Sequence, residues 1–245
     1  MIEFVIQMSA FHRRFHWMLS GLCQQTGGVP AFRLRVDLAE TDPYRDLTAG
    51  LQAAFDSLLD IEWHEHGDRA FGQRGGLRNA ALQESAADWL LFSDADMMYP
   101  PAFMADLASQ YLNTGQYDTS LLSVVRRRTT VAITDALVAD ADYGGPIPDA
   151  FGRARAAWVS APDGESIARA TGYFQLCRRT EALKRGTYCQ RDRSHDVPLR
   201  NGKGGNFRSD VQFRRGWPIV ALDLPPLIHL RHQRTWKNEW DGACR

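Results

Sequence analysis

Two aspartates, Asp94 and Asp96, are the residues of this chain whose types and spacing point most directly to chemistry. They follow the apolar run at residues 89–92 and precede residues 97–101, which read Met-Met-Tyr-Pro-Pro. Side chains at positions i and i+2 project to the same side of an extended backbone, so both carboxylates face one way at the end of a strand. Oxygen ligands of this kind hold a divalent cation and leave room for a phosphate. The pair therefore predicts a metal–diphosphate site.

The first half of the chain alternates segments of strand period and helix period, which must position this pair. Expected strands cover residues 2–8, 31–38, 60–64 and 88–93, and expected helices cover residues 13–25, 47–59, 76–87 and 101–112. Such alternation predicts an α/β fold with a mostly parallel central sheet and helices on both faces. Ligands of these sheets bind beyond the carboxyl ends of the strands. We therefore expect Ser9, Asp37, Asp94 and Asp96 to converge on one crevice.

The second half is less regular. Its expected elements are strands at 121–125, 171–177, 219–222 and 227–230 and a short helix at 181–185. We interpret Arg126-Arg127-Arg128 as a solvated strand end and residues 139–168 as a long loop or short helices. Residues 189–207 hold three glycines among charged residues, which is typical of a mobile lid.

Composition sets the class of protein. The chain has 245 residues, 44% of them hydrophobic and 24% charged, which favours one globular domain. Its four scattered cysteines lack the C-x-x-C spacing of zinc sites, and they favour a reducing compartment. The sequence shows neither a secretory signal nor an apolar run approaching the roughly 20 residues that span a bilayer. We therefore expect a cytoplasmic protein, with peripheral attachment to a membrane left open.

Charge is unevenly distributed although the formal net charge is +0. Residues 1–125 carry 8 Lys and Arg against 16 Asp and Glu, a net charge of −8. Residues 126–245 carry 21 against 13, a net charge of +8. The basic half suits phosphates, an acidic acceptor, nucleic acid or a membrane surface. Alternatively, the two halves attract each other, and both interpretations stay open here.

The order Arg78-Asn79, apolar strand, Asp94-Ala95-Asp96 resembles the R-N…D-x-D core of glycosyltransferases with the GT-A fold. The inverting family-2 branch is nearest, and the resemblance covers most of residues 1–115 and then only patches. It implies a single GT-A (Rossmann-like) domain over residues 1–245. Within it, residues 1–125 would bind the nucleotide sugar and residues 126–245 the acceptor. The implied reaction is metal-dependent transfer of a sugar from a nucleotide-sugar donor, preferably a UDP-sugar, to a hydroxyl group.

The resemblance also assigns roles to residues of a donor and metal site. Asp37 matches the acidic residue that contacts the nucleotide base, and Arg78 would pair with the diphosphate or fix the acidic loop. Asp96 is the expected direct ligand of Mn²⁺ (or Mg²⁺), with Asp94 acting through water or a ribose hydroxyl. His229 resembles the C-terminal histidine that completes the metal site. The expected donor-binding residues are Ser9, Asp37, Arg78, Asp94, Asp96 and Arg231, and the expected metal ligands are Asp94, Asp96 and His229.

The expected catalytic base is a carboxylate that takes the proton of the acceptor hydroxyl. Asp210 follows a glycine-rich stretch and lies in the segment 205–211, which resembles the family's acceptor-side motif. It aligns with the family's base, although Ser209 stands where an acidic residue often precedes that base. Capping of the following helix explains the same aspartate equally well. Asp196, beside His195, is the rival base.

Two other functional classes stay open. A nucleotidyltransferase of related fold needs a glycine-rich loop after the first strand, and residues 9–14 contain no glycine. A non-catalytic module that binds a nucleotide or glycan is the other class. The acceptor is likewise open between a glycan, a lipid-linked intermediate, a protein and, as a minority alternative, a modified nucleic acid. His64-Glu65-His66 is not interpreted as a metal site, because no second cluster of ligands supports it.

Overall fold

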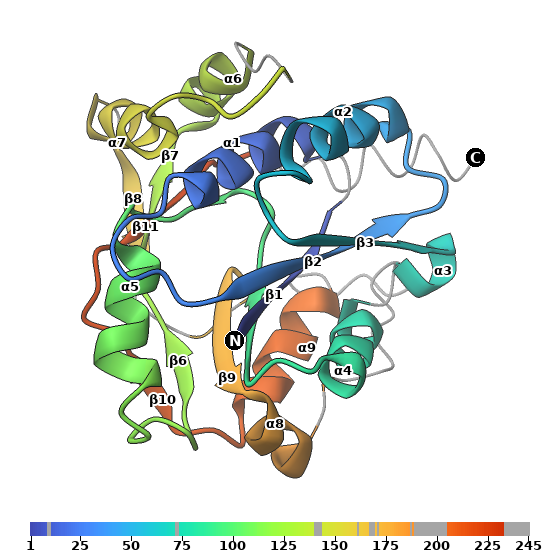
Figure 1. Cartoon of the computed structure of the whole chain (residues 1–245), viewed down its shortest axis with the longest axis vertical. Coiled ribbons are helices and arrows are strands. Elements are labelled where there is room, and N and C mark those ends of the chain that lie inside the picture. Colours follow the sequence, from blue (N-terminus) through green and yellow to red (C-terminus); the bar gives the residue numbers. More distant parts are fainter. Residues whose placement is uncertain are drawn as a thin grey trace.

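The structure is a computed structural model that describes residues 1–8, 11–71, 74–139, 144–160, 162–166, 170, 172–186, 188 and 205–232. Two sheets and the helices packed on them make up the described part of the chain (Figure 1).

The larger sheet has seven strands in the order β10-β6-β9-β4-β1-β2-β3. Its strands are β1 (Ile2–Gln7), β2 (Phe32–Ala39), β3 (Ile61–His66), β4 (Trp89–Ser93), β6 (Leu121–Ser123), β9 (Phe174–Arg178) and β10 (Ile219–Ala221). All pairs are parallel except those that β9 makes with β4 and β6. The predicted mostly parallel α/β sheet is therefore confirmed.

Helices cover both faces of this sheet because its central strands are apolar on both sides (Figure 1). On one face, Phe4 and Ile6 of β1 pack in a core with α1 (His12–Cys23), α2 (Arg45–Phe55) and α5 (Phe103–Leu107). On the other, Val5 of β1 and Phe92 of β4 pack against α4, α8 and α9. The bounds of the remaining helices on this sheet are α3 Asp68–Phe71, α4 Arg74–Glu84, η1 Ala108–Leu112 (a π-helix), α8 Arg179–Arg185 and α9 Gly205–Arg214.

The smaller sheet has four strands in the order β5-β11-β7-β8. They are β5 (Met97–Met98), β11 (Leu227–His229), β7 (Arg126–Thr129) and β8 (Pro162–Ser166), and the helices beside them are α6 (Val131–Ala139) and α7 (Ala150–Ser160). Ile228 of β11 and Met98 of β5 share a core with Trp17 of α1 and Ala150 and Ala154 of α7. The first strand of this sheet, β5, directly follows the acidic pair in the sequence. The sheet therefore determines which residues surround that pair.

Two expectations need correction, and a third falls mostly outside the described residues. Arg126-Arg127-Arg128 is not a solvated strand end: these residues form β7 between β11 and β8, a pairing with residues far away in sequence. The region 139–168, expected to be a long loop or short helices, holds the 11-residue helix α7 and the strand β8, so the helical alternative was right and the strand was not expected. The predicted lid at 189–207 lies outside the described residues up to position 204, and its last three residues begin α9. Among the described residues, no helix combines the length and apolarity needed to cross a membrane.

Candidate functional site

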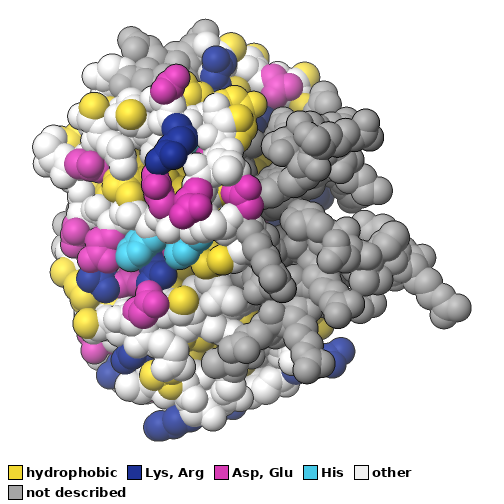
Figure 2. All heavy atoms as spheres, turned by 90° about the vertical axis from the view of Figure 1, so that its right-hand side faces the viewer, with side chains coloured by type: hydrophobic (Ala, Val, Ile, Leu, Met, Phe, Trp, Pro, Cys, Tyr) yellow, Lys and Arg dark blue, Asp and Glu magenta, His cyan; other side chains and the backbone are white. Residues whose placement is uncertain are grey.

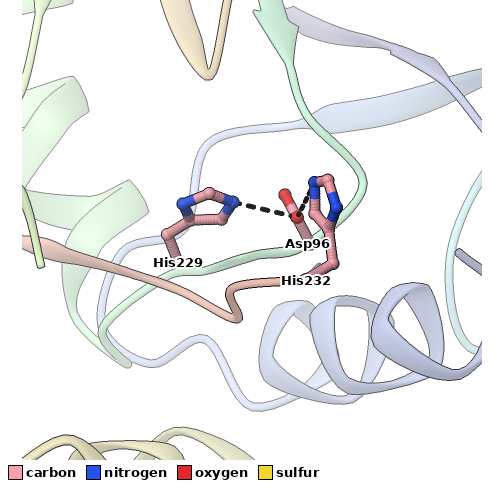
Figure 3. A group of neighbouring side chains, drawn as sticks. All are labelled: Asp96, His229 and His232. Carbon is pink, nitrogen blue, oxygen red and sulfur yellow. Dashed lines mark hydrogen bonds and ion pairs between the residues drawn. The ribbon is translucent and has the colours of Figure 1, made fainter. Parts of the chain in front are cut away.

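Asp96, His229 and His232 bring one carboxylate and two imidazoles together after β4. One possible ligand atom from each lies within 4.8 Å of the others. His229 Nε2 is 3.0 Å from Asp96 Oδ2, and His232 Nε2 is 3.9 Å from the same oxygen (Figure 3). Both rings approach this carboxylate from the segment that contains β11. We call these three residues the metal triad.

The smaller sheet explains why residues so distant in sequence meet. Asp96 lies between β4 and β5, and β5 pairs antiparallel with β11 so that Met97 stands opposite His229. The Leu230 N–H donates a hydrogen bond to the Asp96 carbonyl at 2.9 Å. The His232 ring packs edge-on against Phe11, with 4.7 Å between ring centroids. Backbone pairing and one aromatic contact therefore hold both imidazoles beside the carboxylate.

The atoms of the metal triad fit a divalent cation. Asp96 is only 3% exposed, and its Oδ1 is buried with no hydrogen-bond partner among the described residues. A buried polar atom without a partner is costly, and a cation bound to the carboxylate offsets that cost. Carboxylate oxygen and imidazole nitrogen are ligands that Mn²⁺ accepts. His232 was not among the predicted ligands, although its spacing of three residues from His229 was a signal.

Asp94 lies outside the metal triad and pairs with an arginine. Arg74 Nη2 donates to Asp94 Oδ1 at 2.6 Å and to the Gly172 carbonyl at 3.2 Å. Burial raises the pKa of Asp94, but the charge and hydrogen bond of Arg74 outweigh this and lower that pKa to about 2. Asp94 is therefore ionised and paired with Arg74, whereas the contacts of the Asp96 carboxylate come from two histidines and, among the described residues, from no arginine or lysine.

We expect the Asp94–Arg74 pair to make folding stability depend on pH in the acid range. The pKa of Asp94 is depressed in the folded protein, so its stabilising contribution is complete above the unfolded pKa of about 3.9. The contribution disappears as the pH falls from about 4 toward 2. The measurement is urea unfolding of wild type and Asp94→Asn between pH 6 and roughly pH 2. The stability difference should shrink steadily below about pH 4, and a constant difference would contradict the assigned pair.

Asp37, on β2, is 1% exposed and holds a second buried acceptor without a hydrogen-bond partner among the described residues. Its Oδ1 accepts hydrogen bonds from Arg35 Nε at 3.2 Å and from His66 Nε2 at 2.7 Å, in the tautomer that carries the proton there. Its Oδ2 is buried and has no hydrogen-bond partner in the described structure. This oxygen can accept a hydrogen bond from an N–H or O–H of a ligand. His66 was missed as a site residue, and the H-E-H sequence of β3 was the signal.

Asp37 and the acidic loop belong to the same edge of the sheet. β2 and β4 flank β1 on either side, so their carboxyl ends are about 10 Å apart. On the side of the molecule where β3 ends, both acidic and basic side chains lie beside histidine side chains (Figure 2). The rings of His64 and His66 are stacked there, with 6.5 Å between centroids. The buried Asp37 acceptor on β2 and the metal triad after β4 are therefore separated by a distance that one extended ligand can span.

Arg78 and Asp210, predicted as donor contact and catalytic base, form an ion pair in which both residues are buried. Arg78 also donates to Gln175 Oε1 and to the Gly172 carbonyl, each at 3.1 Å. Its guanidinium lies 5.3 Å from the ring centroid of Phe92 and 5.1 Å from that of Tyr188. Arg78 therefore fastens α9 to the central sheet, instead of contacting the acidic loop directly.

The chain resembles solved structures in its fold, but its sequence has no match among family models or curated proteins. S. aureus TarS (residues 1–349) in complex with UDP matches with a TM-score of 0.58 and 12% identity, over 93% of this chain and 59% of that one. The complex of the same protein with UDP-GlcNAc gives 0.56 and 12%, over 95% and 58%. The Pyrobaculum calidifontis mannosyltransferase PcManGT, in complex with GDP-Man and Mn²⁺, gives 0.53 and 14%, over 96% and 58%.

The chain has the GT-A fold. It spans about three fifths or less of the length of the solved chains that it matches. At this identity the likeness establishes the arrangement of the backbone and nothing about the reaction.

Three predicted site residues need a separate statement. Ser9 and Asp196 lie outside the described residues. Arg231 follows β11, and its backbone N–H donates to Thr129 Oγ1 of β7 at 3.1 Å. The predicted site residues that the structure describes thus form three groups in this fold. They are Asp37 on β2, the acidic loop with the metal triad and the adjoining Arg231, and the Arg78–Asp210 pair.

Proposed function

We propose that the chain is a metal-dependent glycosyltransferase, which moves a sugar from a nucleotide-sugar donor to a hydroxyl acceptor with inversion by direct displacement. The observation that carries this proposal is the metal triad, which lies beside a neutralised second aspartate after β4. The complexes of TarS with UDP-GlcNAc and of PcManGT with GDP-Man and Mn²⁺, on the same fold, support it.

Two groups of residues bind the two ends of the donor in this proposal. Asp96, His229 and His232 would hold Mn²⁺ or Mg²⁺, and a cation bound there would supply the positive charge that stabilises a departing nucleoside diphosphate. Oδ2 of Asp37, which has no hydrogen-bond partner among the described residues, accepts a hydrogen bond from the nucleobase or ribose. A UDP-sugar is the preferred donor. The acceptor is a hydroxyl group of a glycan, a lipid-linked intermediate or a protein.

Inversion requires a carboxylate that takes the proton of the acceptor hydroxyl as it attacks. Asp210 and Asp196 are the two candidates in this proposal. Arg78 occupies Oδ1 of Asp210, so Oδ2 is the oxygen that remains to accept a proton. Replacing each aspartate singly by asparagine identifies the base, because loss of the base abolishes transfer while donor binding persists.

We expect Mn²⁺-dependent binding of a nucleoside diphosphate. The measurement is calorimetric titration with UDP and GDP, with and without Mn²⁺, together with thermal unfolding. A ligand present at about 100 times its Kd stabilises the folded state by about 2.7 kcal/mol, which gives a clear rise in Tm. EDTA should abolish the rise and added Mn²⁺ should restore it. If neither nucleotide binds under any metal condition, the proposed function is wrong.

The products separate this proposal from its two alternatives. With a panel of UDP- and GDP-sugars, a glycosyltransferase releases nucleoside diphosphate only when the cation is present. A nucleotidyltransferase releases pyrophosphate from a nucleoside triphosphate instead. Tight binding of a nucleotide sugar without release or transfer to any acceptor would identify a non-catalytic binding module.

A further inference from the structure

Arg128, on β7, is a partly buried arginine whose charge is unbalanced. Its Nε is buried, and among the described residues this atom has no hydrogen-bond partner and the guanidinium forms no ion pair. Its neighbours differ: Arg126 lies 4.2 Å from the ring centroid of Tyr173, and Arg127 lies 4.6 Å from that of Trp158. Burying a cation without a partner is costly, so such a residue marks a place where an anion binds.

The strand pairing places Arg128 beside the metal triad. β7 pairs parallel with β11, and Arg128 stands opposite His229 in an unbroken register. The irregularity of β7 is confined to its pairing with β8. Side chains opposite each other on neighbouring strands project to the same face, about 5 Å apart. The side chain of Arg128 therefore runs alongside that of His229.

The helices on the other face confirm this orientation. Arg127 reaches Trp158 of α7, and Thr129 bonds to Thr134 of α6 at 2.6 Å. Ile228 of β11, opposite Arg127, packs in the core that contains α7. Alternation along β7 then directs Arg128 away from these helices, to the face from which His229 approaches Asp96.

The charges around the metal triad match a diphosphate. Arg74 forms an ion pair with Asp94, whereas no arginine or lysine among the described residues does so with Asp96. A divalent cation on the triad, together with Asp96 and Arg128, has a surplus of positive charge. The diphosphate of a nucleotide sugar carries one negative charge on each phosphate group, and guanidinium is well suited to phosphate oxygens. We propose that Arg128 binds the diphosphate of the donor on the β7 side of the metal triad. This inference rests on the proposed function.

The test compares two variants of one strand. Arg128→Gln removes the proposed contact, and Arg127→Gln removes the same charge from the opposite face. Wild type and both variants are titrated calorimetrically with UDP, GDP and inorganic pyrophosphate in the presence of Mn²⁺, and with Mn²⁺ alone. We expect Arg128→Gln to weaken binding of the nucleotide and of pyrophosphate by about 10- to 100-fold. Arg127→Gln should stay within about twofold of wild type.

Two further measurements exclude a merely structural role. Arg128→Gln should bind Mn²⁺ alone at least as tightly as wild type, because a neighbouring positive charge has been removed. Its urea midpoint should be equal to or above that of wild type, because an unpaired, partly buried charge is gone. Arg128→Lys should recover part of the lost affinity for pyrophosphate, since it restores the charge without the planar fork.

Each outcome decides the inference. If Arg128→Gln keeps wild-type affinity for UDP, GDP and pyrophosphate, or if Arg127→Gln loses as much, Arg128 does not bind the diphosphate and the proposed function is unaffected. A fall in Mn²⁺ affinity and in stability alongside the loss would show a structural role and also overturn the inference. If wild type binds neither nucleotide nor pyrophosphate, both the inference and the proposed function fail.

Discussion

Replacing Asp96 by asparagine is expected to abolish turnover. The carboxylate is the only anionic member of the metal triad, and an amide oxygen is a much weaker ligand for a hard cation. Release of nucleoside diphosphate from the best donor should fall by about a thousandfold or more, because charge on the leaving group is no longer stabilised. The measurements are initial rates at saturating donor and titration of Mn²⁺ by electron paramagnetic resonance.

Asp94→Asn is the matched control for metal binding, because it makes the same chemical change two residues away. Asp94 pairs with Arg74 and lies outside the metal triad, so this variant should keep its Mn²⁺ affinity within about tenfold. Loss of Mn²⁺ binding in Asp94→Asn with retention in Asp96→Asn would reverse the two assignments. Loss in both variants would mean that both carboxylates hold the ion, as the sequence analysis expected.

The Arg78–Asp210 ion pair is expected to be the polar contact with the largest effect on folding. Both residues are at most 5% exposed, and Arg78→Met leaves a buried carboxylate without its partner. The variant also takes hydrogen-bond donors from Gln175 and Gly172. We expect a loss of about 3–5 kcal/mol in the free energy of unfolding. Urea unfolding at neutral pH measures this loss.

An exposed ion pair supplies the control for this prediction. Arg45 and Glu65 lie 2.6 Å apart with side chains 59% and 51% exposed, and Arg45→Met should cost no more than about 1 kcal/mol. Adding Asp210→Asn to Arg78→Met should recover part of the loss, because the uncompensated charge is then removed. Equal midpoints for Arg78→Met and Arg45→Met would show that the buried pair contributes no more than a surface pair.

Local pattern was sufficient to predict the acidic pair and the elements that carry it. An apolar run followed by Asp94 and Asp96 indicates a buried strand that ends at a ligand site, and β4 is such a strand. The same local reasoning predicted β1 from its apolar run, α1 from its helical spacing, and β2 from the alternation of apolar and charged residues. The GT-A fold class followed from that alternation and the resemblance together, and it is confirmed.

Local pattern could not separate the two aspartates. They stand two residues apart on one backbone, so spacing gives them the same direction. Their roles differ because Arg74, from α4, reaches Asp94, while His229 and His232 reach Asp96. These partners come from segments that precede and follow the pair by many residues. Only folding brings the arginine to one carboxylate and the two histidines to the other.

The smaller sheet was likewise beyond local reasoning. Three consecutive arginines have no apolar alternation, so β7 carries no strand signal of its own. It forms because β11 and β8 supply hydrogen bonds on either side, and because Arg126 and Arg127 each lie over an aromatic ring. The position of Arg128 beside His229 is a consequence of that register.

Neighbours a few positions apart were sufficient to predict a mostly parallel, helix-covered sheet with carboxylates after its fourth strand. Only the folded chain shows which carboxylate meets two imidazoles, which one pairs with an arginine, and where the guanidinium of Arg128 lies. The physical reason is that burial period is a local property of the chain, whereas the ionic environment of a side chain is set by strands and helices that approach it from far along the sequence.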